Sequence, residues 1–253
     1  GHPQPLHALN WYHRASPASG GINQPEATMT HPLPEILSRL NADMRSDDNW
    51  GDVAAYIPEL AHVDPAQFAI SVATADGQLF SVGDADTLFS VQSITKVFTL
   101  AIALGRSGDH LWKRVGREPS GRAFNSIVQL EAESGRPRNP FINAGAIVVT
   151  DSLLTGRQPR ETLGEIIQSV RTVAEDEDIH INERVANSEN AHGHRNYALA
   201  HFLASTGNLD NPPEMTLGTY FHHCAIEMST RQLAMAGRFL IDSPNVPPGV
   251  STR

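Results

Sequence analysis

A β-hairpin that leads directly into an apolar helix is the feature that most restricts the fold of this chain. Phe68, Ile70 and Val72 alternate with their neighbours, Asp76-Gly77 is a typical hairpin turn, and residues 78–82 return as a second strand. Through 83–86 the chain then enters a helix predicted over about 93–104. Helical spacing predicts a buried stripe on that helix, made of Val97, Leu100, Ala101 and Leu104.

The rest of the chain predicts mainly helices. Residues 1–32 lack periodicity and are expected to form a flexible N-terminal extension, and a domain is expected over 33–253. Pro58 biases Ile57 towards extended backbone, and 116–143 is interpreted as a long irregular loop. One helix is predicted to begin with residues 33–40. Further helices are predicted near 163–170, 197–205, 216–228 and 231–240, and residues 144–154 form an apolar segment. Two strands make no stable sheet for a chain this long, so either helices carry the core or further strands lie outside this chain.

Charge and cysteine content exclude several classes of protein. The 253 residues carry a net charge of −9 with no basic run, which disfavours a nucleic-acid or anionic-membrane partner. A single cysteine, Cys224, excludes an internal disulfide framework. No apolar run reaches membrane-spanning length and the start has no signal-peptide pattern, so a cytoplasmic location is expected.

Ser93 and Lys96 are the first candidates for catalysis. Three residues apart, they share one face of the first helical turn, where a neutral lysine amine can take the proton of a serine hydroxyl. The chain has 17 arginines but only two lysines, Lys96 and Lys113, so lysine is rare where a simple positive charge would serve. A helix-capping serine beside a solvated lysine is the alternative interpretation.

Ordered motifs over most of the chain resemble the serine-dependent glutaminases, which share the β-lactamase/penicillin-binding-protein fold. The matching stretches are GDVAAYIPEL at 51–60, DG at 76–77, GDADT at 83–87, VQSITK at 91–96, EPSG at 118–121 with FN at 124–125, NPFINAGAI at 139–147, SE at 188–189, RN at 195–196, and Tyr220 before CAIE at 224–227. The resemblance implies an α/β (α+β) fold in which an antiparallel sheet packs with a helical subdomain.

The resemblance also implies a reaction, namely hydrolysis of L-glutamine to L-glutamate and ammonia through a glutamyl-serine ester. Ser93 would be the nucleophile and Lys96 its base, without cofactor or metal, in a homodimer or homotetramer. The family's substrate-binding positions fall on Ser93 and on Tyr56, Asn143, Glu189, Asn196 and Tyr220.

The chemistry of these residues agrees with that substrate, because each polar end of glutamine needs a partner once it leaves water. Glu189 is the natural counter-ion for the α-ammonium, and the amides and phenols can bind the carboxylate or the side-chain amide. Each residue also has a plainer interpretation. Glu189 could be a solvated surface acid, Asn143 and Asn196 could be helix caps, and the two tyrosines could be core or groove aromatics.

The family pattern continues past the last residue of this chain. It includes a further catalytic tyrosine and a Lys-Ser-Gly strand, but no tyrosine follows Tyr220 and no lysine follows Lys113 here. The C-terminal strands are therefore expected to be missing from this chain and the working enzyme to be longer. A protein that ends at Arg253 is expected to be unstable or inactive.

Three other functions stay open at this point. A penicillin-interacting hydrolase would use Ser188-Glu189-Asn190 as its S-x-N motif, and slow β-lactam turnover would favour it. An inactive glutamine-binding or scaffold protein would bind glutamine without releasing ammonia. A metal enzyme could use its histidines, but the adjacent His222 and His223 point in different directions on a helix and are poor joint ligands.

Overall fold

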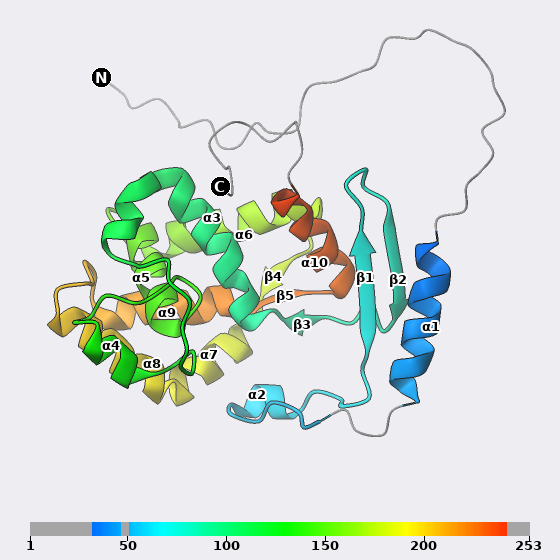
Figure 1. Ribbon diagram of the computed structural model, residues 1–253, viewed down its shortest axis with the longest axis horizontal. Coiled ribbons are helices and arrows are strands. Elements are labelled where there is room, and N and C mark those ends of the chain that lie inside the picture. The colour runs from blue at the N-terminus through cyan, green and yellow to red at the C-terminus, as the bar shows by residue number, and fades with distance from the viewer. Residues whose placement is uncertain (1–31, 47–50, 242–253) are drawn as a thin grey trace, which may run out of the picture. The chain divides into compact units, whose positions relative to one another are not determined.

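The computed structural model describes residues 32–46 and 51–241, shown as coloured ribbon in Figure 1. The predicted extension at 1–32 lies almost wholly outside the described residues. The proline-rich stretch near 244–248 lies outside them as well.

Helices dominate the described part of the chain. They are α1 (Leu33–Arg45), α2 (Pro58–Ala61), α3 (Thr95–Ser107), α4 (Ile127–Ala132), α5 (Asn143–Leu154), α6 (Pro159–Ala174), α7 (Glu183–His192), α8 (His194–Ser205), α9 (Pro213–Cys224) and α10 (Thr230–Gly237), with 3₁₀ turns η1 (Gln92–Ile94), η2 (Gly108–Lys113) and η3 (Arg238–Leu240). The strands are β1 (Ala69–Ala73), β2 (Leu79–Gly83), β3 (Phe89–Ser90), β4 (His180–Ile181) and β5 (Ile226–Met228). The fold is thus mixed α/β, mostly helical, with small antiparallel sheets.

The predicted hairpin is present as β1 and β2. The strands pair antiparallel with Ala69 opposite Gly83, and Gly77 has a φ of +89° in the turn, a conformation that favours glycine. The hairpin lies between α1 and α10 (Figure 1). Pro58 has the expected effect on its predecessor, because Ile57 is extended at φ −130° and ψ 148°.

A second sheet corrects the predicted helix over 216–228. That helix ends at Cys224, and Ile226–Met228 form strand β5 between β3 and β4. Ile226 pairs with Ile181 and Met228 with Phe89, so tertiary pairing decides the conformation of this segment. Strand β3 also separates the hairpin from the central helix.

The core lies between helices, and α5 stands at its centre. Val149 and Leu153 of α5 pack in one apolar cluster with Phe98 and Ile166. The neighbouring Ala144, Ala146, Ile147 and Val148 join a second cluster with α8 and α9. Every residue of α5 except Ser152 is buried, so within the described residues helices carry most of the core.

Three further expectations differ from the structure. The helix near Ser93 begins as the 3₁₀ turn η1 and becomes α-helical at Thr95, and its most buried side chains include Phe98, Thr99 and Ala103 rather than the expected stripe. The irregular region 116–143 contains the short helix α4, and α7 was not predicted from the sequence.

None of the helices described is both long and apolar enough to cross a membrane.

Candidate active site

Ser93 lies in the strained 3₁₀ turn that precedes α3. Gln92, just before it, has a φ of +48°, which a residue with a side chain rarely adopts. The N–H of Val91 donates to Ile226 O at 2.9 Å and fastens the start of this turn to β5. The backbone N–H of Thr95 donates to the carbonyls of Gln92 and Ser93 and closes the turn. Ser93 itself is exposed, so its hydroxyl can meet a ligand.

Lys96 is buried one turn further on, with 3% of its surface exposed. Its Nζ donates to Phe141 O at 3.0 Å and to Asn143 Oδ1 at 2.8 Å, and the Phe124 ring centroid lies 5.9 Å away. Burial lowers the pKa of Lys96 from its usual value, because the charged amine loses water. The two acceptors can satisfy both N–H groups of a neutral amine, whose lone pair would then be free to take a proton. No hydrogen bond joins Ser93 Oγ to Lys96 Nζ among the residues described.

Asn143 and Asn196 extend this network from α5 to α8. Asn143 Nδ2 donates to Asn196 Oδ1 at 2.9 Å, so one side-chain amide bonds Lys96 and Asn196 together. Neither side chain caps its own helix, and the helix-cap interpretation is wrong. Gly145 allows this arrangement, because a Cβ there would clash with the Asn139 carbonyl just before the Phe141 segment.

Tyr56 and Glu189 form a second polar pair, from residues 133 positions apart in the chain. The Tyr56 hydroxyl donates to Glu189 Oε1 at 2.9 Å. Glu189 is only 6% exposed, so the surface-acid interpretation is wrong, while Tyr56 is 62% exposed. Burial raises the pKa of Glu189, and the Tyr56 hydrogen bond and His192 oppose that shift. Burial, followed by the charge and hydrogen bond of Glu189, raises the pKa of Tyr56.

Tyr220 is buried beside this pair. Burial raises its pKa well above the usual value, with further contributions from Cys224, Glu189 and Tyr56. Its ring meets that of His223 edge-on, with centroids 5.2 Å apart. The structure therefore links Lys96, Asn143 and Asn196 in one network, pairs Tyr56 with Glu189, and places Tyr220 within the electrostatic influence of Glu189 and Tyr56.

Sequence reasoning missed several groups around Lys96. The Phe141 carbonyl and the Phe124 ring belong to motifs of the resemblance, but a backbone oxygen and an exposed phenylalanine carry no sequence signal of their own. His223 drew attention only as a metal candidate, and it hydrogen-bonds to Thr95 and Thr150 instead. The described residues hold no group of three His, Cys, Asp or Glu side chains placed to bind a metal ion.

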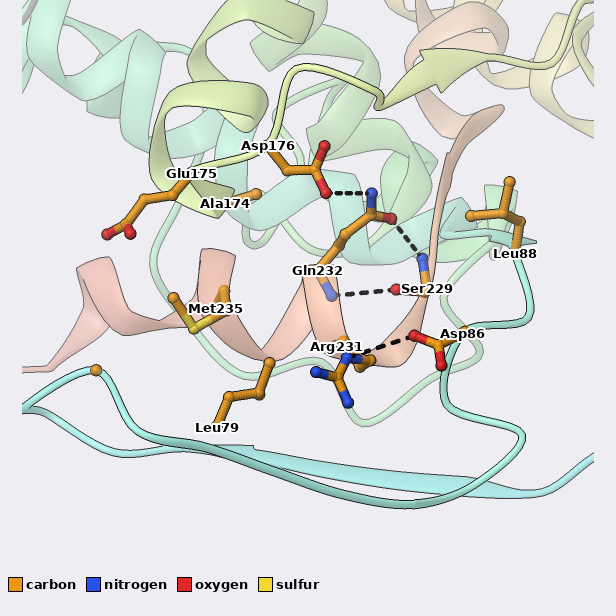
Figure 2. A pocket seen from close by; sticks show the side chains of 11 residues that line it. Leu79, Asp86, Leu88, Ala174, Glu175, Asp176, Ser229, Arg231, Gln232 and Met235 are labelled. Carbon is orange, nitrogen blue, oxygen red and sulfur yellow. Dashed lines mark hydrogen bonds and ion pairs between the residues drawn. The ribbon is translucent and has the colours of Figure 1, made fainter.

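A cavity of about 420 Å³ lies away from these residues, against the hairpin and α10 (Figure 2). Most of its polar side chains pair with one another, while Glu175 pairs with Arg238 outside the lining. Gln232 Nε2 donates to Asp176 Oδ2 at 2.8 Å, and Arg231 Nε lies 3.4 Å from Asp86 Oδ1. None of the candidate site residues lines this cavity.

Comparison with solved structures places the fold among the glutaminases. The structure titled Mglu in its glutamate form matches with a TM-score of 0.77 at 37% identity, over 84% of this chain and 48% of that chain. A probable glutaminase, ybaS, matches with a TM-score of 0.78 at 32% identity, over 82% of this chain and 67% of that chain. The chain thus spans about half the length of the Mglu chains.

The sequence comparisons point to the same family. The sequence profile of the family described as Glutaminase matches residues 51–248. A Mesorhizobium japonicum protein named Glutaminase is 57% identical over 223 residues, which cover 88% of this chain and 71% of that protein. A Rhodopseudomonas palustris Glutaminase is 60% identical over 215 residues, covering 85% and 69%. The chain belongs to the glutaminase family.

Proposed function

We propose that this protein hydrolyses L-glutamine to L-glutamate and ammonia through a glutamyl ester of Ser93, with Lys96 as the base. The observation that carries the proposal is the state of Lys96. It is a buried amine of lowered pKa, hydrogen-bonded to two neutral acceptors, three residues from an exposed serine hydroxyl. A buried lysine that can lose its proton is what a serine needs to become a nucleophile.

The reaction follows as two proton-coupled steps. Ser93 Oγ attacks the carbonyl carbon of the side-chain amide while Lys96 Nζ accepts the hydroxyl proton. The Lys96 ammonium then protonates the amide nitrogen, the C–N bond breaks, and ammonia leaves. Water attacks the resulting ester, Lys96 accepts a proton from it, and cleavage of the Oγ–C bond returns that proton to Ser93. Lys96 begins and ends the cycle neutral.

Substrate binding uses the other polar groups of the site. Glu189 supplies a buried carboxylate for the α-ammonium, oriented by the Tyr56 hydroxyl. Asn143, Asn196 and Tyr220 offer uncharged donors and acceptors to the α-carboxylate and the side-chain amide. A site that holds both ends of glutamine misplaces the amide of asparagine, which is one methylene shorter, relative to Ser93.

The relatives support the substrate. The bacterial relatives are named Glutaminase, and one structural neighbour is described as Mglu in its glutamate form. Glutamate is the product of the proposed reaction. The β-lactamase/transpeptidase-like fold, a domain over 33–253, a cytoplasmic location and a homodimer or homotetramer belong to the same proposal. They rest on the family resemblance.

The test measures ammonia release from L-glutamine and L-asparagine, together with glutamine binding by calorimetry. We expect turnover of glutamine alone, and we expect Ser93→Ala to abolish it while binding stays within about threefold, since Oγ contributes little to ground-state binding. Turnover that survives in Ser93→Ala would refute the nucleophile. Glutamine binding without ammonia release would favour the inactive binding protein. Slow β-lactam turnover without glutamine turnover would favour the penicillin-interacting hydrolase.

A further inference from the structure

His223 is a buried titratable group that the proposed mechanism does not use. It lies on α9 with no exposed surface, and its two ring nitrogens contact side chains of α3 and α5. Nδ1 lies 2.9 Å from Thr95 Oγ1, and Nε2 lies 3.0 Å from Thr150 Oγ1. One imidazole therefore bridges the helix that carries Lys96 and the helix that begins with Asn143.

Thr95 connects this ring to the nucleophile turn. Its hydroxyl donates to Gln92 O at 2.9 Å. Gln92 is the residue with φ at +48° directly before Ser93, a backbone conformation that persists only where surrounding contacts hold it. The Thr95 hydroxyl is thus a side-chain contact on the strained peptide that sets the direction of Ser93.

Counting protons decides which tautomer can maintain that contact. The Thr95 hydroxyl has one proton, and while that proton goes to Gln92 O the same oxygen can only accept from His223 Nδ1–H. Cys224 Sγ, 3.8 Å from this oxygen, is a longer and weaker hydrogen-bond partner than either. The imidazole is neutral in this position, because burial lowers the pKa of His223 to about 3.

The Nδ1–H tautomer leaves Nε2 as an acceptor for the Thr150 hydroxyl. In donating to Nε2, the Thr150 hydroxyl loses its hydrogen bond to Ala146 O, 2.9 Å away. The Ala146 carbonyl still accepts its α-helical backbone hydrogen bond within α5. The Nε2–H tautomer would instead draw the Thr95 proton away from Gln92. The two tautomers therefore differ in whether the Thr95 hydroxyl adds its hydrogen bond to the one that the Thr95 backbone N–H already makes to Gln92 O.

We propose that His223, as the Nδ1–H tautomer, is a positioning residue for Ser93. It donates to Thr95, directs the Thr95 proton to the Gln92 carbonyl, and so helps to fix the turn that carries the Ser93 hydroxyl. The role in turnover rests on the proposed function, whereas the tautomer and the hold on the turn do not.

Two conservative variants separate the ring nitrogens. The side-chain amide of an asparagine carries its N–H one bond from Cγ, as Nδ1 does in the imidazole. His223→Asn therefore retains the donor to Thr95 and loses the contact with Thr150.

His223→Gln carries its amide one atom further out, near Nε2, and loses the donor to Thr95. We expect His223→Gln to lower kcat by about 10²-fold, the order of loss for a displaced reacting group, with KM unchanged, while His223→Asn retains kcat within about threefold. If both variants lost kcat equally, and in proportion to the fall in their melting temperatures, the proposal would be overturned and His223 would have only a packing role.

The threonines provide a matched pair around the same ring. Thr95→Val removes the hydroxyl at nearly constant shape and should reproduce the loss of kcat, without adding to it in combination with His223→Gln. Thr95→Ser should restore kcat. Thr150→Val, on the other side of the ring, should leave kcat within about twofold. A Thr150→Val variant as impaired as Thr95→Val would contradict the assigned direction of the hydrogen bonds.

Two measurements do not require glutamine turnover. Long-range ¹H–¹⁵N NMR of the ¹⁵N-histidine-labelled protein should show His223 protonated at Nδ1, and protonation at Nε2 would refute the proposal. The rate at which a fluorophosphonate probe labels Ser93, read by peptide mass, should fall in His223→Gln and not in His223→Asn. If the wild-type protein releases no ammonia, the proposed function fails while these two results still decide the role of His223.

Discussion

Replacing Glu189 by glutamine tests the binding half of the site most directly. The substitution keeps the size of the side chain and an oxygen for the Tyr56 hydroxyl, and removes only the charge. If Glu189 binds the α-ammonium of glutamine, Glu189→Gln should weaken glutamine binding far more than it weakens binding of 4-carbamoylbutanoate, which is glutamine without its amino group.

The burial of Glu189 sets the size of the effect. With 6% of its surface exposed, the carboxylate meets a ligand cation largely out of water. Losing one partner of such a pair costs about 2–5 kcal/mol, or roughly 30-fold to several thousandfold in Kd. A solvated surface pair would cost about 1 kcal/mol or less, under tenfold.

The pH dependence of binding gives a second signature. Because burial raises the pKa of Glu189, its negative charge is lost at a higher pH than that of an exposed glutamate. Glutamine affinity should therefore weaken as pH falls through that raised pKa, whereas Glu189→Gln should bind equally at either pH. Tyr56→Phe removes a hydrogen bond that lowers this pKa, so the weakening should begin at a higher pH in that variant.

Calorimetry in a Ser93→Ala background measures these affinities without turnover. Each variant is measured with both ligands, at one pH above and one pH below the raised pKa of Glu189. The affinity of each variant for one ligand is then compared with its own affinity for the other ligand and at the other pH. Glutamine affinity that is unchanged in Glu189→Gln would refute the assignment, as would an equal loss for the ligand without an amino group. Weakening at low pH that persists in Glu189→Gln would assign the titration to another group.

The remaining predictions concern Lys96 and the buried ion pair of α5. Because neutral Lys96 is the proposed base and burial lowers its pKa, kcat should rise with pH and level off above that pKa. Lys96→Arg, which cannot lose its proton, should lower kcat by about 10²–10⁴-fold in a stopped assay, and an active variant would exclude the base role. Asp151 has no exposed side-chain surface and pairs with Arg114 at 2.5 Å, so Asp151→Asn should destabilise the fold by about 3–5 kcal/mol and lower Tm by roughly 6–20 °C. Asp210, 58% exposed and paired with the same arginine, is the matched control, and Asp210→Asn should cost about 1 kcal/mol or less in urea unfolding.

Local sequence signals predicted the elements that short-range chemistry determines. Asp76-Gly77 marks the hairpin turn, Pro58 extends Ile57, and the spacing of Ile166 and Val170 predicts α6. These features depend on neighbours within a turn or two, so one sequence contains the information that fixes them.

Long-range packing determined what the sequence could not give. Residues 226–228 continue a helical pattern, but strands on both sides hold them in a sheet. Helix α5 is buried on all sides and has no amphipathic period. Its apolar run therefore predicted a buried segment but did not indicate a helix with one buried face. Helix α4 was hidden between the glycines and prolines of a region that resembles a loop.

The candidate site shows the same division. Ser93 and Lys96 are recognisable as a pair because they are three residues apart. Tyr56 and Glu189 are 133 residues apart, and only the family motifs brought them together before the structure joined them by a hydrogen bond. The role inferred for His223 needs the positions of both ring nitrogens, which no sequence pattern encodes.

The burial of α5 has a consequence for the entropy of ligand binding. Asn143 begins a helix packed on every side, so its amide is already fixed when a ligand arrives and loses little conformational freedom. Tyr56 lies on an exposed stretch outside any helix or strand, and fixing its ring over a ligand has an entropic cost. The proposed site thus combines a preorganised side at α5 with a more adjustable side at Tyr56. If both residues bind the substrate, restricting the motion of Tyr56 should raise affinity without any new contact.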